Sequence, residues 1–351
     1  MPIVIENMCK YLQFCIFLYP NISKYLNISL YFRDKSLNLS AEIIKFNPFH
    51  RMSQVISFLH DKGGCAKTTS CVNLGFALWL LGKKVLLIDT DPQCNLTDTV
   101  DKTVHLEAET TIYDWLHDFK PGEQRSLPIY TRYEGLDYVP GSHSMSNINA
   151  ELQLMYNREH RLSDFLDIED PESGAKIRNM YDYIFIDCAP GGETLMNTNA
   201  LVASDFVIVP TEAGIYSLQG LPRLLDYIDK VRTQLRCPVS ILGYLLVRWN
   251  AQKAISKEVK AYYSNEEEVK APLFPVYIRE CVRCTESVAY EMSLFEYSPD
   301  CTAADDYMRV AEYLIGRKAR PKTWTPVKWG QIANAAFQRF TKEREGEVPE
   351  T

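Results

Sequence analysis

The sequence predicts an α/β fold in which a mostly parallel, twisted β-sheet carries helices on both faces. Short apolar runs without polar alternation recur along the chain, as is typical of strands that are buried on both faces. Helix-like segments separate these runs, and this alternation favours parallel strands that are joined by helices. At 351 residues the chain has room for one large α/β domain or two small ones.

The expected elements alternate regularly from Met52 onward. Strands are expected at Val55–Leu59, Val85–Ile88, Leu136–Pro140, Tyr183–Ile186, Phe206–Val209 and Ile241–Val247, with a last strand at Phe274–Ile278. Helices are expected at Thr69–Leu81, Thr111–His117, Asn147–Leu166, Leu218–Leu235 and Thr302–Ile315. Gly82 follows the first helix at the position where a glycine commonly ends a helix.

Residues 60–69 lie between the first strand and the first helix and read His-Asp-Lys-Gly-Gly-Cys-Ala-Lys-Thr-Thr. A glycine-rich turn in that setting is typical of a phosphate-binding loop. Gly63 and Gly64 allow backbone N–H groups to approach an anion closely. Lys67 is placed to reach the terminal phosphates, and the Thr68 hydroxyl is placed to ligate a magnesium ion.

The loop departs from the common G-x-x-x-x-G-K-[ST] pattern. Asp61 and Ala66 stand where that pattern has glycines, and a second lysine, Lys62, precedes the glycine pair. The Ala66 methyl group is expected to narrow the loop slightly without preventing nucleotide binding. His60, at the end of the strand, is expected to be structural.

Carboxylates follow two of the predicted strands. Asp89 and Asp91 come after the second strand, and Asp187 comes after the run Tyr183–Ile186. Ligands collect at the carboxyl ends of strands in such sheets, and buried carboxylates are costly unless they meet a cation or hydrogen-bond donors. We expect a magnesium ion held by Thr68, with Asp187 acting through water and Asp89 beside it. Asp91 is placed to orient an attacking water.

Three motifs, Lys62–Thr69, Asp89–Asn95 and Asp187–Pro190, together resemble those of the deviant-Walker ATPases of the ParA/Soj/MinD group. The Asp-Pro-Gln-x-Asn stretch is a habit of the partition branch, ParA. Later segments agree, namely Pro210–Glu212, Leu218–Leu221, Tyr297–Pro299 and Ala303–Tyr307. The resemblance covers roughly residues 52–315 and implies a P-loop NTPase fold.

The resemblance also implies roles for individual residues. ATP and Mg²⁺ would be bound by the loop and the strand ends, through Gly63, Gly64, Cys65, Ala66, Lys67, Thr68, Thr69, Pro210 and Thr211. Lys62 would reach across a homodimer interface to the partner's phosphates, while Lys67 would bind the phosphates of its own subunit. Asp91 would position or activate the hydrolytic water.

The implied activity is a slow ATPase that acts as a positioning device. Such proteins form an ATP-dependent sandwich dimer that binds DNA without sequence preference and so segregates a plasmid, a chromosome or other cargo. A ParB-like centromere-binding protein or another partner stimulates hydrolysis. The expected location is the cytoplasm, on the nucleoid.

The net charge of −7 does not by itself favour DNA, so binding must rest on local basic residues. Candidates after the late strands are Arg248, Lys253, Arg279 and Arg283, and a denser basic cluster comprises Arg317, Lys318, Arg320 and Lys322. Solvated surface charge is the alternative interpretation for each.

The chain is expected to divide into three parts. Residues 1–51 are an N-terminal extension of doubtful order, or a consequence of start-codon choice. They lack the basic flank and cleavage site of a secretory signal. Residues 52–316 form the ATPase domain. Residues 317–351 comprise a basic segment, a short amphipathic helix over Trp329–Phe340 and a disordered tail.

Ten cysteines show no regular framework, which favours reduced thiols in a cytosolic chain. Cys281 and Cys284 form a lone C-x-x-C pair. A metal site needs more ligands, so chance spacing is the favoured interpretation.

Two other functions compete with partition. A MinD-like, membrane-associated positioning ATPase would end in a basic amphipathic helix. The chain has no apolar stretch of about 18 residues, and acidic residues follow Phe340, so a membrane partner is not expected. A ligase or reductase component on the same loop would need a substrate pocket or paired cluster cysteines, and the sequence reveals neither.

Overall fold

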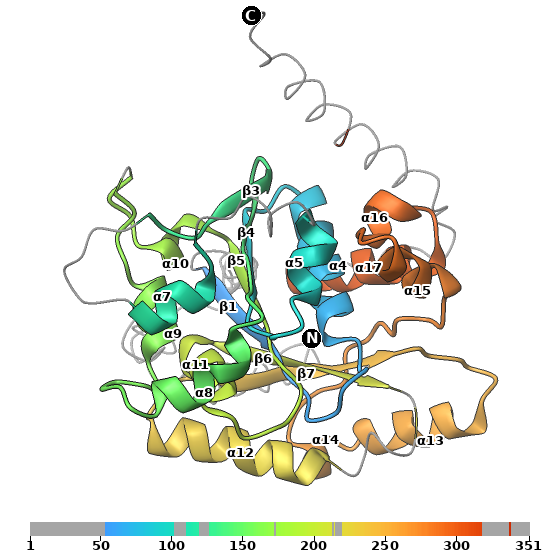
Figure 1. Cartoon of the computed structure of the whole chain (residues 1–351). Coiled ribbons are helices and arrows are strands. Elements are labelled where there is room, and N and C mark those ends of the chain that lie inside the picture. The colour runs from blue at the N-terminus through green and yellow to red at the C-terminus, as the bar shows by residue number, and fades with distance from the viewer. Residues whose placement is uncertain are drawn as a thin grey trace, which may run out of the picture. The chain divides into compact units, whose positions relative to one another are not determined.

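The computed structural model describes residues 53–101, 110–118, 126–171, 173–212, 214, 220–317 and 337. Within these residues seven strands form one sheet in the order β3-β4-β2-β5-β1-β6-β7 (Figure 1). All neighbouring strands are parallel except β3 and β4. The strands are β1 Gln54–Phe58, β2 Val85–Asp89, β3 Tyr130–Tyr133, β4 Leu136–Val139, β5 Tyr183–Asp187, β6 Phe206–Glu212 and β7 Ser240–Val247. The predicted fold class is therefore confirmed.

Helices cover both faces of this sheet. In Figure 1, α7, α8, α9 and α11 lie on one side, and α4, α15, α16 and α17 lie on the other. The helices are α4 Lys67–Leu80, α5 Asn95–Asp101, α7 Ile112–Asp118, α8 Met145–Leu152, α9 Arg161–Leu166, α10 Ile177–Met180, α11 Leu195–Ala203, α12 Leu221–Gln234, α13 Ala254–Tyr263, α14 Glu266–Val269, α15 Val282–Ala289, α16 Leu294–Tyr297 and α17 Thr302–Leu314. Every described helix is too short or too polar to span a membrane.

The central strands are apolar because both of their faces are covered. β1, β2 and β5 are buried along their whole length. Since successive side chains alternate in direction, Ile184 and Ile186 join the core beneath α9 and α11. Phe58 and Phe185 project to the opposite face, where their rings make an edge-to-face contact at 5.1 Å between centroids.

Helix α4 is the buried helix of the site-bearing half. It packs against α17 and ends as predicted at Gly82, whose φ is +82°. The Gly82 N–H donates to the Trp79 carbonyl at 2.8 Å, and the Lys83 N–H donates to the Leu78 carbonyl at 3.1 Å. These two bonds form a Schellman motif, which turns the chain directly into β2.

Two predicted elements differ from the structure. The helical stretch Asn147–Leu166 is two helices, α8 and α9, separated by a turn in which Asn157 is left-handed with φ +57°. Leu154 and Tyr156 in this turn are 89% and 98% exposed, while Met155 between them packs against the core.

The predicted strand Phe274–Ile278 is also wrong. The segment runs beside β7 and makes isolated bridges at Leu273 and Arg279 only. Pro275 has no N–H to donate and interrupts the ladder. The structure instead adds β3, an edge strand of half-exposed residues that an apolar run does not reveal.

The predicted segments 1–51 and 317–351 lie outside the described residues, apart from Arg317 and Phe337. The Phe337 ring centroid lies 5.3 Å from that of Tyr133.

Candidate functional site

The loop and the carboxylates meet at one edge of the sheet because β2, β5 and β1 are neighbours. Asp89 pairs in register with Asp187, and Asp187 pairs with Phe58 at the end of β1. The chain leaves β1 as the loop of residues 60–66 and enters α4 at Lys67. Parallel strands thus place three separate sequence motifs within one small volume.

The loop takes left-handed turns that free its N–H groups. Gly64 has φ +76°, and Ala66 has φ +58° and ψ +34°. Ala66 is the N-cap of α4 and offers no side-chain cap, so the first-turn N–H groups face outward at the positive end of a 14-residue helix. Ala66 therefore adds backbone strain of about 1–2 kcal/mol, beside the narrowing expected of its methyl group.

Lys67 and Thr68 point into the same volume. Lys67 is 6% exposed, and its Nζ donates to the Lys62 carbonyl at 3.3 Å, which holds the cation over the loop. The Thr68 hydroxyl donates to Asp187 Oδ2 at 2.6 Å. This contact joins the first residues of α4 to the end of β5.

Asp187 is fully buried, and its second oxygen, Oδ1, has no hydrogen-bond partner among the described residues. Burial, followed by the charge of Asp89, raises the pKa of Asp187 well above its usual range. Mg²⁺ is a hard cation that prefers oxygen ligands, and the Thr68 hydroxyl and Asp187 Oδ1 are ligands of this type. The residues present therefore fit a magnesium ion beside Thr68 and Asp187.

Asp89 does not fit the metal role that the sequence suggested. Its Oδ2 accepts from the N–H and the hydroxyl of Thr97 at 2.9 and 2.7 Å, and its Oδ1 accepts from the Asp91 N–H at 3.1 Å. These bonds oppose the burial that raises its pKa to about 6. Both oxygens are engaged, so Asp89 holds the turn between β2 and α5 instead.

Asp91, which the sequence suggests as the residue that orients water, lies at the nucleotide cleft. It is 6% exposed and lies beside the loop on the wall of the cleft that contains Lys67. Its Oδ1 accepts from the Gln93 N–H at 2.9 Å, which fixes the carboxylate's direction.

Lys62 lies at the rim rather than inside. Its side chain is 45% exposed, with Nζ 3.8 Å from Glu212 Oε2, and Arg248 approaches the other oxygen of Glu212 at 3.3 Å. His60 Nδ1 accepts the Lys62 N–H at 3.0 Å. Burial, then the charges of Lys67 and Lys62, lowers the pKa of His60 to about 4. The neutral ring acts as a backbone acceptor, as its predicted structural role requires.

The cleft around the loop has a volume of about 570 Å³. Its walls come from the loop, from the segment after β2 and from α15. Gly63, Gly64, Ala66, Thr68 and Thr69 line it, as predicted for nucleotide-binding residues.

Three predicted nucleotide contacts do not line this cleft. Thr211 is buried in β6 and donates to the Val209 carbonyl at 3.2 Å, and Pro210 beside it is not part of the cleft wall. The Cys65 thiol is buried 3.7 Å from His60 Nδ1, so its side chain cannot meet a ligand in the cleft.

Three of the candidate DNA-binding arginines, Arg248, Arg279 and Arg283, pair with carboxylates of the same chain. Arg279 donates twice to the carboxylate of the buried Asp306, at 2.8 Å to each oxygen, and this argues against the expected DNA contact. Arg283 pairs with Glu286 at 2.6 Å on the surface of α15. Arg317 is exposed, while Lys318 and Arg320 lie outside the described residues.

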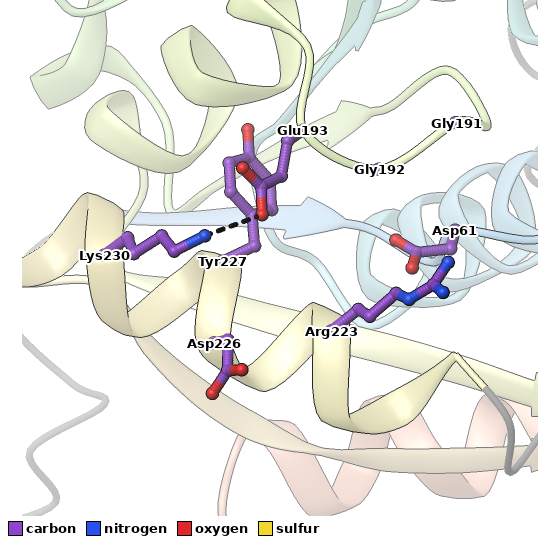
Figure 2. Close-up of a pocket in the computed structure, with 8 residues that line it drawn as sticks. All are labelled: Asp61, Gly191, Gly192, Glu193, Arg223, Asp226, Tyr227 and Lys230. Atoms are coloured by element: carbon purple, nitrogen blue, oxygen red, sulfur yellow. Dashed lines mark hydrogen bonds and ion pairs between the residues drawn. The ribbon is translucent and has the colours of Figure 1, made fainter.

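A second pocket, of about 430 Å³, lies on the other side of the phosphate loop (Figure 2). The Asp61 carbonyl accepts the Gly191 N–H at 3.1 Å, and its carboxylate lies against Gly192. The Arg223 guanidinium of α12 points at Asp61, and Lys230 pairs with Glu193 at 3.1 Å. Asp61, which the sequence showed only as a missing glycine, therefore ties the loop to the segment after β5.

Sequence reasoning also missed the supports of α4. The hydroxyls of Ser70 and Tyr307 lie 3.1 Å apart in the core, and the Leu294 N–H donates to Asn73 Oδ1 at 2.8 Å. Both partners are more than 200 positions away in the chain, with separations of 237 and 221. Only the tertiary structure reveals such pairs.

Comparison with known proteins shows the family to which the chain belongs. Residues 53–241 match a family model described as an AAA domain. The chain is 30% identical to the chromosome partitioning protein ParA of Caulobacter vibrioides over 271 residues, which are 76% of this chain and 95% of that protein. It is 32% identical to the sporulation initiation inhibitor protein Soj of Bacillus subtilis, over 74% of this chain and 98% of that protein.

Solved structures share the same fold. Cobyrinic acid a,c-diamide synthase from Mycobacterium smegmatis with bound ADP and magnesium superposes with a TM-score of 0.61 at 25% identity, over 78% of this chain and 100% of that one. A variant of McdA from Cyanothece in complex with ATP superposes with a TM-score of 0.63 at 22% identity, over 77% of this chain and 99% of that one.

The fold and the loop define a P-loop NTPase. Within that class the chain belongs to the ParA/Soj family, as its motifs predicted.

Proposed function

We propose that the protein is an ATP-dependent positioning ATPase of the partition type, which binds ATP with Mg²⁺ and dimerises around it. The observation that carries this proposal is the pairing of a buried lysine, Lys67, with a rim lysine, Lys62, on one phosphate loop. One lysine suffices to bind the phosphates of the same subunit. A second, half-exposed cation at the rim is suited to the phosphates of another subunit.

Each residue of the cleft then has a distinct task. The N–H groups at the start of α4 and the Lys67 ammonium hold the phosphates. Thr68 and Asp187 hold the magnesium ion, which supplies charge neutralisation at the phosphates when it is bound. Asp91 orients the attacking water, and its bond to the Gln93 N–H keeps one oxygen directed toward that task.

In the proposed dimer, Lys62 exchanges its contact with Glu212 for the partner's phosphates. The Lys62–Glu212 distance of 3.8 Å between half-exposed groups marks a weak ion pair, worth under about 1 kcal/mol. Such a contact positions the side chain without fixing it. Binding of a second subunit's phosphates would replace one carboxylate by several negative oxygens.

The central test compares Lys62→Ala with a matched control. Lys176 is 46% exposed and lies 3.7 Å from Asp167, so Lys176→Ala removes a similar surface ion pair far from the loop. We expect Lys62→Ala to abolish ATP-dependent dimerisation or turnover while the monomer stays folded, and Lys176→Ala to behave like the parent. If Lys62→Ala dimerises and hydrolyses normally in analytical ultracentrifugation and phosphate-release assays, the cross-subunit role is wrong.

Asp91→Ala separates binding from hydrolysis. This variant should bind ATP and dimerise but release no phosphate, because the water loses its orienting carboxylate. Normal turnover would remove Asp91 from this role.

The location of the dimer is tested by parallel retention assays. We expect ATP-dependent retention on DNA that falls steeply as salt rises, since phosphate contacts release counterions, and no retention on anionic vesicles. Replacing Arg317, Lys318 and Arg320 together should weaken DNA retention uniformly across sequences. ATP-dependent binding to vesicles instead would favour a MinD-like function, and turnover that needs a small-molecule substrate would favour a ligase.

A further inference from the structure

Three cysteines gather where two helices begin, beside the nucleotide cleft. Cys281 is the N-cap of α15, Cys284 lies in the first turn of that helix, and Cys301 is the N-cap of α17. The Cys281 thiol interacts with the thiols of both Cys284 and Cys301. All three are free and partly exposed. The third cysteine, 17 positions beyond Cys284, was not visible in the spacing of the C-x-x-C pair.

The surroundings of Cys281 are suited to a thiolate. The backbone N–H groups of Arg283 and Ala303 and the Thr302 hydroxyl all face its sulfur, so two helix N-termini converge on one atom. Partial burial opposes ionisation, but these donors outweigh it and lower the pKa of Cys281 below its usual range. Burial raises the pKa of Cys284 to about 12, so the Cys284 thiol ionises much less readily than the Cys281 thiol.

The segment that carries Cys281 is held firmly on α17. Arg279, two residues before it, donates its N–H and its guanidinium to the buried Asp306 at 2.8–2.9 Å. The Cys301 sulfur accepts the Ala304 N–H at 3.4 Å, which engages it as a helix cap. Cys284 is the thiol of the cluster that shares a helical turn with Cys281, since its N–H donates to the Cys281 carbonyl at 3.1 Å.

We propose that Cys281 and Cys284 form a redox site in which Cys281 is the nucleophile toward a hydroperoxide and Cys284 closes a disulfide with it. A metal site is not favoured here. Among the described residues, no three His, Cys, Asp or Glu side chains are arranged to hold a metal ion.

The chemistry balances with one hydroperoxide. The Cys281 thiolate attacks an oxygen of the hydroperoxide, the O–O bond breaks, and water or an alcohol leaves after taking a proton. The Cys284 sulfur then attacks the resulting sulfenic sulfur, the S–O bond breaks, and the hydroxyl leaves as water with the Cys284 proton. Two thiols are oxidised to one disulfide, and the peroxide is reduced.

The site shares its cleft with the phosphate loop. Cys281 and Cys284 line the same cleft as Lys67 and Thr68. Tyr307 lines this cleft together with Cys284, and its hydroxyl lies 3.1 Å from that of Ser70 in α4. We therefore expect the disulfide to lower the affinity for ATP, an expectation that rests on the proposed function.

The chemical test uses the full-length protein and equimolar hydrogen peroxide, followed by alkylation and peptide mapping. Trypsin cleaves after Arg283 and so separates Cys281 from Cys284. A glutamate-specific protease, cleaving after Glu286, Glu291 or Glu296, separates Cys284 from Cys301. We expect a Cys281–Cys284 link that dithiothreitol reverses and that persists in Cys301→Ser. In Cys284→Ser, Cys281 should be trapped as a sulfenic acid that dimedone captures.

Cys237→Ser serves as the control, because Cys237 is also partly exposed but lies outside the cluster. This variant should oxidise at Cys281 like the parent. The proposal is overturned if Cys281 reacts no faster than Cys237, or if its disulfide runs to Cys301.

The link to nucleotide is read separately, by titrating fluorescent ATP into reduced and oxidised protein. A several-fold loss of affinity on oxidation, absent in Cys284→Ser, is expected, and equal affinities would overturn the coupling. If the reduced protein binds no ATP, the proposed function fails, while the peptide map still decides the redox chemistry.

Discussion

At the residue scale, the phosphate loop depends on side chains that never touch a ligand. His60 is 4% exposed, and its Nδ1 accepts the Lys62 N–H at 3.0 Å, so Nδ1 must stay unprotonated. Ala66 adopts a backbone conformation that favours glycine. Each residue gives a test that separates the architecture of the loop from its chemistry.

His60 predicts acid sensitivity in a defined window. Its pKa is about 4 in the folded chain and near 6.5 in the unfolded chain, so the unfolded state binds the extra proton first as pH falls. The stability from neutral His60 is therefore complete above about pH 6.5 and is lost toward pH 4, by on the order of 3 kcal/mol. Denaturant unfolding of His60→Asn, which keeps an acceptor without a titrating group, should show a shallower pH dependence across this window.

The opposite result for His60 is equally clear. If the parent and His60→Asn lose stability in parallel between pH 7 and pH 4, the ring is not buried as a neutral acceptor.

Ala66 predicts a stabilising substitution. Ala66→Gly removes left-handed strain of about 1–2 kcal/mol and adds about 0.4–1 kcal/mol of unfolded-chain entropy. We expect the free energy of unfolding to be unchanged or to rise by up to about 1 kcal/mol. A loss of more than about 1 kcal/mol in urea titrations would show that the methyl group packs usefully. As the matched control, Ala77→Gly in the interior of α4 should destabilise.

At the element scale, the segment between α14 and α15 runs beside β7 and contributes to the far wall of the cleft. It is not a strand, because Pro275 interrupts its pairing with β7. Arg279 compensates by fixing the segment to α17 through Asp306, which is 2% exposed. The same contact engages the Arg279 guanidinium, although its side chain stays 45% exposed.

Arg279→Gln is therefore expected to destabilise the fold by roughly 1–3 kcal/mol, because Asp306 keeps its charge in a buried place. Arg283→Gln, at the start of α15, breaks only exposed contacts, with Glu286 and Tyr297, and should leave thermal unfolding unchanged. If the two variants unfold alike, Asp306 does not need Arg279. Thermal melts of both variants, followed by circular dichroism, make the comparison.

At the scale of the whole molecule, the proposed function makes ATP a switch for assembly. A ligand that binds only the folded state raises the free energy of unfolding by about 2.7 kcal/mol at 100 times its dissociation constant. Because Asp187 Oδ1 lacks a donor, we expect ATP with Mg²⁺ to stabilise the protein more than ATP with a chelator. With Mg²⁺ and ATP, the melting temperature should also rise with protein concentration, since a dimer dissociates as it unfolds.

Calorimetric scans at two protein concentrations check this prediction. A melting temperature that ignores both Mg²⁺ and concentration would contradict the assembly step, although it would leave the fold untouched. The Lys62→Ala variant should lose the concentration dependence and keep the ligand-induced shift.

What the sequence determined by itself was local or periodic. Apolar strand runs and the loop His60–Thr69 are contiguous in the chain, so the parallel sheet, the phosphate loop and the family followed from them directly. Asp187 could be placed at a strand end because four buried residues precede it. Helix ends shifted by up to three positions, and the half-exposed edge strand β3 gave no apolar signal.

The tertiary structure alone decided which polar groups still have capacity for a ligand. Asp89 and Asp187 look alike in the sequence, yet Thr97 and Asp91 satisfy the first while an oxygen of the second has no donor. In the sequence Arg279 looks like a surface charge, but in the structure it pairs with Asp306 of α17. In the same way, the fold places Cys301 beside the C-x-x-C pair. The physical reason is common to all three cases. A side chain's chemistry is set by the donors, charges and burial around it, and long-range packing brings those partners together.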